Sequence, residues 1–180
     1  RIENDPLGEQ AVPADALYGI QTLRAAENYP ISGPRPLPAF VDAVIQIKKA
    51  AALTHKETGR LEAKLADAIA AAATEVLAGH HRDQFVVDVY QAGAGTSHHM
   101  NVNEVLANLA ADQLGAPRGE YTRVHPNDHV NMAQSTNDVI PTAMRLATLA
   151  TLPPLLEAMD RLAKAFLSKG GEFDPIIKSG

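Results

Sequence analysis

A polar run between two apolar segments carries the residues best suited to chemistry. Residues 125–138 read His-Pro-Asn-Asp-His-Val-Asn-Met-Ala-Gln-Ser-Thr-Asn-Asp, a concentration of imidazole, amide and hydroxyl groups. Ser135, Thr136 and Asn137 favour helix N-termini, and apolar periodicity begins directly after them. A helix N-terminus adds free backbone N–H groups to these donors. We expect this run to line a site that stabilises an anion, although the same residues would also suit an ordinary capped helix.

A second donor-rich stretch lies earlier in the chain. Gly93-Ala94-Gly95-Thr96-Ser97 is expected to lead into a helix that begins at Thr96 or Ser97. The two glycines allow the backbone to approach a small ligand closely, and the two hydroxyls would again stand at a helix N-terminus. The stretch has neither the Lys-Ser/Thr pair of a P-loop nor G-x-G-x-x-G spacing, which argues against a nucleotide site. Two such helix starts could hold the two ends of a dicarboxylate.

The seven histidines do not form a metal-binding pattern. His125 and His129 have an i,i+4 interval, but Pro126 between them disfavours continuous helix and no Glu stands there as in a zincin. The adjacent pairs at 80–81 and 98–99 would point in different directions on a helix or strand. The sequence therefore predicts no catalytic metal.

Composition narrows the class of protein. Of the 180 residues 46% are hydrophobic, 21% are charged and only 4% are aromatic, which favours packed helices over a sandwich or barrel. The absence of cysteine excludes disulfides and Cys-based metal sites, and it fits a cytoplasmic location. A net charge of −5 without a Lys/Arg cluster argues against nucleic acid. No apolar run approaches the roughly 20 residues of a membrane span, so no membrane partner is expected.

The elements that would position these residues are mainly helical. Residues 1–38 are rich in Pro and Gly and are expected to form an irregular arm with one short helix that Asp15 could cap. Residues 85–90 form the only clear β-type run. A kink or helix restart is expected at Pro153-Pro154, inside a long apolar stripe. Apolar periodicity predicts helices over 17–28, 38–58, 60–77, 96–114, 139–151 and 152–166.

Three stretches resemble the first two signature regions of the aspartase/class II fumarase superfamily. They are Gly93 to Ser97, Met100 to Asn108 and the run 125–138, and residues 1–8, 12–19 and 22–25 strengthen the likeness to the aspartate ammonia-lyase branch. Gly-Ala-Gly-Thr-Ser and Ser135-Thr136-Asn137 look more like aspartases, because fumarases tend to have Gly-Ser-Gly-Thr and Ser-Ser-Asn. The resemblance covers essentially the whole chain.

The resemblance implies a fold and an activity. It implies a mainly α architecture in which residues 1–138 form the N-terminal lyase domain and residues 139–180 begin the central helical domain, which is incomplete here. It implies reversible elimination of ammonia from L-aspartate to give fumarate, in amino-acid metabolism, with no metal or organic cofactor in the chemical step. It also implies a homotetramer whose active sites combine segments of three subunits.

Site residues are carried over from the same motifs. By resemblance the substrate-binding positions are Thr96, Ser135, Thr136 and Asn137. His125, Asn127 and Asp128 match a segment that fumarases use as a secondary anion site, and stabilisation of the loop is an equally good interpretation of them. The general base of the family lies in a later Gly-Ser-Ser loop, so we expect no catalytic base in these residues and an inactive isolated chain.

Departures from the family pattern leave alternatives open. His98 and His99 stand where the family often has a small polar residue and Asn, and Met132 stands where Lys is common. The first change could alter substrate choice, and the second removes a charge. A fragment of a class II fumarate hydratase and a non-catalytic domain that reuses the fold are the competing hypotheses.

Overall fold

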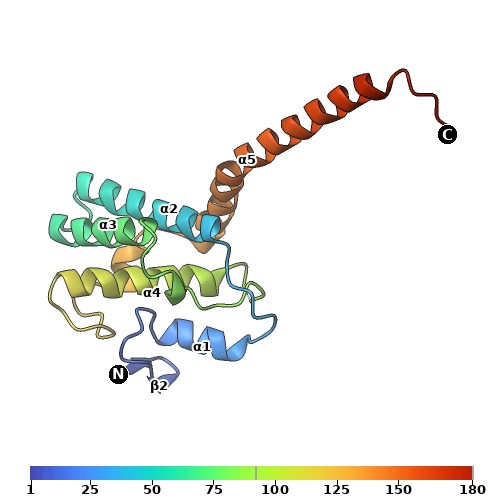
Figure 1. Cartoon of the computed structure of the whole chain (residues 1–180). Helices are drawn as coiled ribbons and strands as arrows, with labels where there is room; N and C mark the ends of the chain where they lie inside the picture. Colours follow the sequence, from blue (N-terminus) through green and yellow to red (C-terminus); the bar gives the residue numbers. More distant parts are fainter. Residues whose placement is uncertain (92, 180) are drawn as a thin grey trace.

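Helices form most of the chain, which confirms the mainly α prediction. The computed structural model describes residues 1–91 and 93–179 (Figure 1). Two short helical turns, η1 (Arg82–Gln84) and η2 (Pro126–Val130), connect longer helices. The remaining elements are β1 (Ile2–Asp5), β2 (Gly8–Ala11), α1 (Ile20–Asn28), α2 (Pro38–Glu57), α3 (Ala63–Leu77), α4 (Thr96–Gln113) and α5 (Thr136–Phe173).

The core lies where α2, α3 and α4 pack together. On α3 the buried apolar residues recur at helical spacing and include Leu65, Ile69 and Val76. On α2 the large apolar residues Phe40 and Ile47 are only half-buried. The residues of α2 that are buried share a stripe at helical spacing, and they are Val41, Ala43, Val44, Ile45, Lys48, Ala52 and His55. A lysine therefore lies within the apolar face of this helix.

The N-terminal arm is more regular than expected. β1 and β2 form a two-stranded antiparallel hairpin in which Ile2 pairs with Ala11 and Asp5 with Gly8. The turn is held by Asp5, whose Oδ1 accepts a hydrogen bond from the Leu7 N–H at 2.9 Å. Pro6, which indicated an irregular segment, instead forms this tight turn with Leu7, and Gly8 begins β2.

The expected strand at residues 85–90 is wrong. Phe85 and Val87 are buried, but the segment is irregular. A side chain, and not strand pairing, joins this segment to residues 32–33. The Asp88 carboxylate accepts hydrogen bonds from the backbone N–H groups of Ser32 and Gly33 at 2.7 and 2.8 Å. The facing segment contains Pro34 and Pro36, which have no N–H to donate to a partner strand. Val87 is therefore buried without strand pairing, whereas Val89 is exposed and makes a single backbone hydrogen bond, from its N–H to the Pro34 carbonyl at 3.2 Å.

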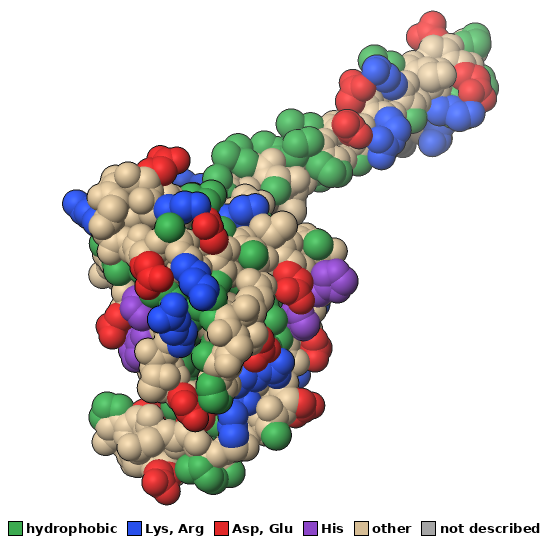
Figure 2. All heavy atoms as spheres, turned by 90° about the vertical axis from the view of Figure 1, so that its left-hand side faces the viewer, with side chains coloured by type: hydrophobic (Ala, Val, Ile, Leu, Met, Phe, Trp, Pro, Cys, Tyr) green, Lys and Arg blue, Asp and Glu red, His purple; other side chains and the backbone are tan. Residues whose placement is uncertain are grey.

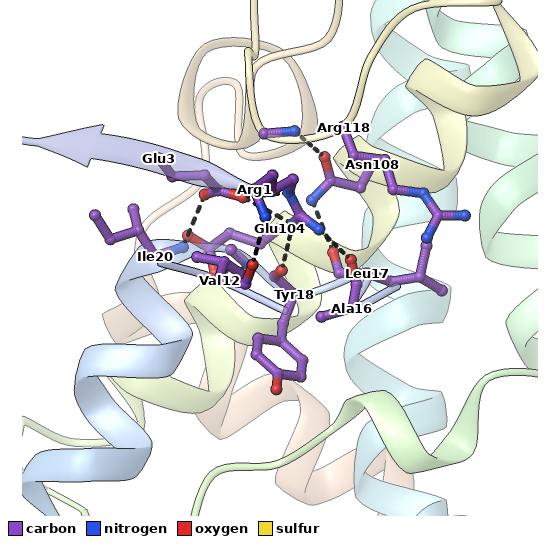
Figure 3. A network of polar contacts seen from close by, with 12 residues as sticks. Arg1, Glu3, Val12, Ala16, Leu17, Tyr18, Ile20, Glu104, Asn108 and Arg118 are labelled. Carbon is purple, nitrogen blue, oxygen red and sulfur yellow. Dashed lines mark hydrogen bonds and ion pairs between the residues drawn. The ribbon is translucent and has the colours of Figure 1, made fainter. Parts of the chain in front are cut away.

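A buried carboxylate from α4 caps the start of α1, so the expected cap by Asp15 is wrong. Glu104 is fully buried and accepts four hydrogen bonds, from the N–H groups of Gly19, Gln21 and Thr22 and from the Thr22 hydroxyl. Figure 3 shows Glu104 beside Glu3, which accepts the Ile20 N–H and pairs with the Arg1 guanidinium. Two acidic side chains thus satisfy the free N–H groups at one helix end.

The C-terminal helix leaves the body. α5 runs without interruption from Thr136 to Phe173, so no restart occurs at Pro153-Pro154, although Figure 1 shows the helix bending as it projects. Its buried residues, Val139, Ile140 and Ala143, all lie in its first turns. Figure 2 shows hydrophobic side chains along the part of α5 nearest the body and charged ones farther out. Within the described residues, α5 is the one helix whose length and composition would allow a membrane crossing.

Candidate active site

The two predicted helix starts meet in the folded chain. α4 begins directly after Gly95, and α5 begins at Thr136, where the Ser135 hydroxyl accepts the Asn137 N–H at 3.2 Å as a cap. Gly95 has a φ of +91°, and a Cβ added there would lie 3.0 Å from Ile140 in the first turns of α5. Only glycine permits this approach. The sequence therefore places the positive ends of two helix dipoles side by side, as an anion site requires.

A cavity of about 680 Å³ opens at this junction. Thr136 and Asn137 line it from the start of α5, and Ala94 and Gly95 line it from the loop before α4. Apolar side chains form most of the wall, Gln91 adds a polar side chain, and His98 lines the cavity although both of its ring nitrogens are buried. The other lining residues are Pro36, Leu37, Phe40, Val89, Ile140, Pro141 and Met144. An apolar wall with a few polar groups is the usual composition of a small-molecule site.

Two of the four predicted substrate-binding residues line this cavity, and the other two lie beside it. Thr136 and Asn137 line the cavity, whereas Thr96 and Ser135 are exposed beside it and are not among the described lining residues. The Thr96 hydroxyl is turned back to donate to the Gly93 carbonyl at 2.7 Å, and Gly95, not Thr96, is the N-cap of α4. The roles of these four residues toward a substrate stay predictions.

A buried lysine connects this site to the core, and sequence reasoning missed it. The Lys48 Nζ is 2.6 Å from His99 Nε2, and it donates to Asn131 Oδ1 at 2.7 Å and to Gln134 Oε1 at 3.0 Å. His99 Nδ1 in turn is 2.8 Å from the Thr136 hydroxyl. The signal that could have found it is Lys48 itself, which falls in register with Val41, Val44 and Ile45 on an apolar helix face.

Burial changes the titration of these groups. It lowers the pKa of Lys48 to about 7. Burial, and next the charge of Lys48, lowers the pKa of His99 to about 3. Burial also lowers the pKa of His98 to about 4. The two histidines are therefore neutral imidazoles at neutral pH, so they present one donor and one acceptor each instead of positive charge.

The surroundings of His98 are unusual for a buried histidine. Its ring stacks on Phe40 with centroids 4.9 Å apart, and only 1% of the residue is exposed. Neither ring nitrogen has a hydrogen-bond partner within residues 1–91 and 93–179. Because unpaired buried polar atoms are costly, this imidazole destabilises the fold unless a ligand or another chain supplies a partner.

The segment predicted as a secondary anion site lies at η2. His125 caps this π-helical turn, since its Nδ1 accepts the N–H groups of Asn127 and Asp128 at 3.2 and 3.1 Å. His129 Nδ1 accepts the His125 N–H at 2.9 Å. In the described part of the chain, no hydrogen bond or ion pair joins His125, Asn127 or Asp128 to Thr136. These contacts fit loop stabilisation, and the anion role of the three residues stays a prediction.

The imidazoles of His125 and His129 are thus used within the turn. Across residues 1–91 and 93–179, no three His, Asp or Glu side chains are grouped so that they could hold a metal ion. The Met132 side chain, at the position where the family often has Lys, is half-buried and packs against the core.

Comparison with known proteins decides the family. A sequence model of a lyase family matches residues 8–180. The chain belongs to this lyase family. The resemblance to the aspartase/fumarase superfamily is therefore confirmed, and so is the mainly helical fold that it implied, because a family structure superposes on the chain over its whole length. The division into domains at residue 138 stays a prediction.

Relatives within the lyase family carry two different activities in their names. Aspartate ammonia-lyase of Bacillus subtilis is 48% identical over 180 residues, which are all of this chain and 38% of that protein. Class II fumarate hydratase of Halobacterium salinarum is 52% identical over 181 residues, again all of this chain and 38% of that protein. A crystal structure of fumarate lyase:delta crystallin from Brucella melitensis matches with a TM-score of 0.95 and 50% identity, over all of this chain and 41% of that one. The chain spans about two fifths of the length of these relatives.

Proposed function

We propose that the chain forms the N-terminal part of an ammonia-lyase that converts L-aspartate to fumarate and ammonia. The observation that carries the proposal is the cavity where the starts of α4 and α5 meet, lined by Thr136 and Asn137, in a chain of the lyase family. The aspartate ammonia-lyase of Bacillus subtilis, 48% identical, supports the choice of substrate. The proposed enzyme is cytoplasmic and uses no cofactor in the chemical step.

The chemistry requires clustered donors. Removal of a proton from the carbon beside a carboxylate builds a doubly negative aci-carboxylate, whose charge must be met by groups already in place. Each such donor typically contributes about 2.7–4 kcal/mol to transition-state stabilisation. We propose that Ser135, Thr136 and Asn137 supply hydroxyl and amide donors, together with the N–H groups at the start of α5, and that the Thr96 hydroxyl joins them by turning from the Gly93 carbonyl toward the ligand.

Residues 1–180 are proposed to bind substrate without carrying the base. The superfamily resemblance assigns the base to a later loop, and it assigns parts of each site to neighbouring subunits. We therefore expect no fumarate formation from L-aspartate by this chain alone, with ultraviolet absorbance as the readout and the mass of the sample checked at 19.2 kDa. Turnover at that mass would contradict the proposal, and His125→Ala would then be the first variant to assay for the base.

A completed enzyme tests the activity itself. Residues 1–180 would be joined to the C-terminal remainder of the Bacillus subtilis aspartate ammonia-lyase, of which this chain covers 38%. We expect the chimera to form fumarate from L-aspartate and Asn137→Ala to reduce kcat/KM on the order of 100-fold, as loss of a transition-state donor does. A folded, tetrameric chimera without lyase activity would favour a non-catalytic domain.

Fumarate hydration is the second candidate. The class II fumarate hydratase of Halobacterium salinarum is 52% identical to the chain, slightly more than the aspartate ammonia-lyase of Bacillus subtilis at 48%. A second chimera, with the remainder of that fumarate hydratase, separates the alternatives. If both chimeras convert malate and neither converts L-aspartate, the ammonia-lyase proposal fails.

A further inference from the structure

A buried ammonium without a carboxylate partner lies behind the cavity. Lys48 is 0% exposed, and all three of its N–H bonds have acceptors, namely His99 Nε2, Asn131 Oδ1 and Gln134 Oε1. The described residues contain no ion pair to Lys48, and burial alone acts on its pKa. A buried charge held only by neutral groups costs stability.

The ammonium determines which nitrogen of His99 carries hydrogen. A protonated lysine can only donate, so His99 Nε2, at 2.6 Å, must accept with its lone pair. Burial and the charge of Lys48 keep the imidazole neutral by lowering the pKa of His99. Its single hydrogen is therefore on Nδ1, which lies 2.8 Å from the Thr136 hydroxyl and donates to it.

The Thr136 hydroxyl then has its own proton available. Its oxygen accepts from His99, and in the part of the chain that the structure describes its O–H has no protein acceptor. Thr136 lines the cavity at the start of α5. We infer that Lys48 and His99 position the Thr136 hydroxyl so that it donates its proton into the cavity, toward a carboxylate of the ligand. The dicarboxylate nature of that ligand rests on the proposed function.

The hydrogen bonds that connect Lys48, His99 and Thr136 have a defined direction, and it reverses when Lys48 loses one proton. A neutral Lys48 amine would accept from His99 Nε2–H, and His99 Nδ1 would then accept the Thr136 proton, which would no longer point into the cavity. Besides Lys48, the titratable group that acts on His99 is His98, its neighbour on α4. Asn131 and Gln134, which face Lys48 from the segment after η2, are uncharged. Lys48 and His99 are thus positioning residues, since neither needs to touch the ligand.

Nitrogen NMR of the wild-type chain tests the direction of these hydrogen bonds. With ¹⁵N-labelled histidine at about pH 6, where Lys48 is protonated, we expect His99 to show a protonated Nδ1 and an unprotonated Nε2. The spectrum of His99→Gln identifies the signals by their loss. An Nε2–H tautomer or an imidazolium at His99 would overturn the inference.

A lysine substitution tests the origin of the tautomer. Lys48→Met removes the donor at similar length, so the fixed Nδ1–H signature should be lost. Lys56→Met removes an exposed lysine of the same helix, which pairs with Asp67, and should leave the signature unchanged. An unchanged signature in a folded Lys48→Met chain would refute the role of Lys48. If that variant does not fold, wild type above pH 7 serves instead, where the His99 hydrogen should move to Nε2.

The consequence for binding is measured in the completed enzyme. Gln at position 99 keeps one acceptor and one donor, whereas Phe keeps neither. We expect His99→Phe to raise KM for L-aspartate on the order of 10-fold, and His99→Gln to restore most of that loss. Equal KM values for wild type and His99→Phe would overturn the inference while lyase activity upholds the proposed function. An inactive wild-type chimera in which His99 shows the expected tautomer would overturn the proposed function and leave the inference about Lys48 and His99 standing.

Discussion

At the level of single residues, the Glu104 carboxylate ties α4 to the start of α1, where it accepts four hydrogen bonds from Gly19, Gln21 and Thr22. Glu104→Gln places an amide NH₂ against backbone N–H donors, so at least one buried group loses its partner. We expect the free energy of unfolding, measured with urea, to fall by about 3 kcal/mol. Glu157→Gln, an exposed change on α5, should stay within about 0.5 kcal/mol of wild type. A similar result for both variants would show that the cap contributes little.

His98 makes a second residue-scale prediction, which depends on pH. Burial lowers the pKa of His98 to about 4, whereas an unfolded histidine titrates near 6.5. Between these values the unfolded state binds more protons, so the free energy of unfolding decreases as the pH falls from 6.5 to 4. His98→Phe keeps an aromatic ring beside Phe40 and removes this contribution, which amounts to about 3 kcal/mol.

The test compares urea unfolding of wild type and His98→Phe at pH 7 and pH 5. The variant should be the more acid-resistant protein. His99 is present in both proteins, and the two largest causes of its lowered pKa, burial and the charge of Lys48, are kept in the variant. His80→Phe, at an exposed position, is the control and should follow wild type. Parallel pH profiles for wild type and His98→Phe would mean that His98 finds a partner for its charge.

At the level of elements, the junction of α4 and α5 depends on the missing side chain of Gly95. Gly95→Ala introduces strain at a φ of +91° and a Cβ 3.0 Å from Ile140. Gly115→Ala is the matched control, because it has a φ of +69° with nothing within 4 Å of the added Cβ. We expect about 1–2 kcal/mol of destabilisation at Gly115. At Gly95 a further 1–3 kcal/mol or so should come from overpacking. Equal losses by thermal unfolding would show that the junction can yield.

Local signals account for the elements that the sequence predicts well. Pro38 and Gly59 bound α2, and the spacing of Leu65, Ile69 and Val76 marks the inner face of α3. The segment 85–90 has the composition of a strand, but a strand needs a neighbour that both donates and accepts, and the facing prolines have no N–H to donate. Composition records local preference and does not reveal whether a partner exists.

The candidate site also contains one part that the sequence predicts and one part that it does not. Ser135 was predictable as a helix start because its partner, Asn137, is two residues away. The contacts of Lys48 were not, since His99, Asn131 and Gln134 lie 51, 83 and 86 residues away along the chain. Only the packing of α2 against α4 and the segment after η2 brings these groups together. A lysine in an apolar stripe is the one trace that this arrangement leaves in the sequence.

At the level of the whole molecule, the projecting part of α5 exposes a hydrophobic stripe (Figure 2). Leu155, Met159, Leu162 and Phe166 are each more than half exposed, which is typical of a surface that pairs with another helix. We propose, with the superfamily resemblance, that this stripe joins subunits of a homotetramer.

Light scattering after gel filtration tests the stripe. Wild type should self-associate, and the double variant Leu155→Glu/Leu162→Glu should have a mass near the 19.2 kDa of one chain. Lys164→Gln changes a polar position of the same helix, which pairs with Asp160, and should associate as wild type does. A monomeric wild type, or a double variant that associates unchanged, would rule out this surface.

The length of α5 has a mechanical consequence. Its 38 residues extend about 57 Å, and it is anchored only through its first turns. A small rotation at the anchored end, where Gly95 lies against Ile140, therefore moves the far end of the helix by a larger distance. A rotation of about 10° at the anchored end displaces the far end by about 10 Å, given that length. Small rearrangements around Thr136 are thus magnified where subunits would join. Sedimentation should accordingly show weaker self-association for Gly95→Ala than for Gly115→Ala, even where both chains are fully folded.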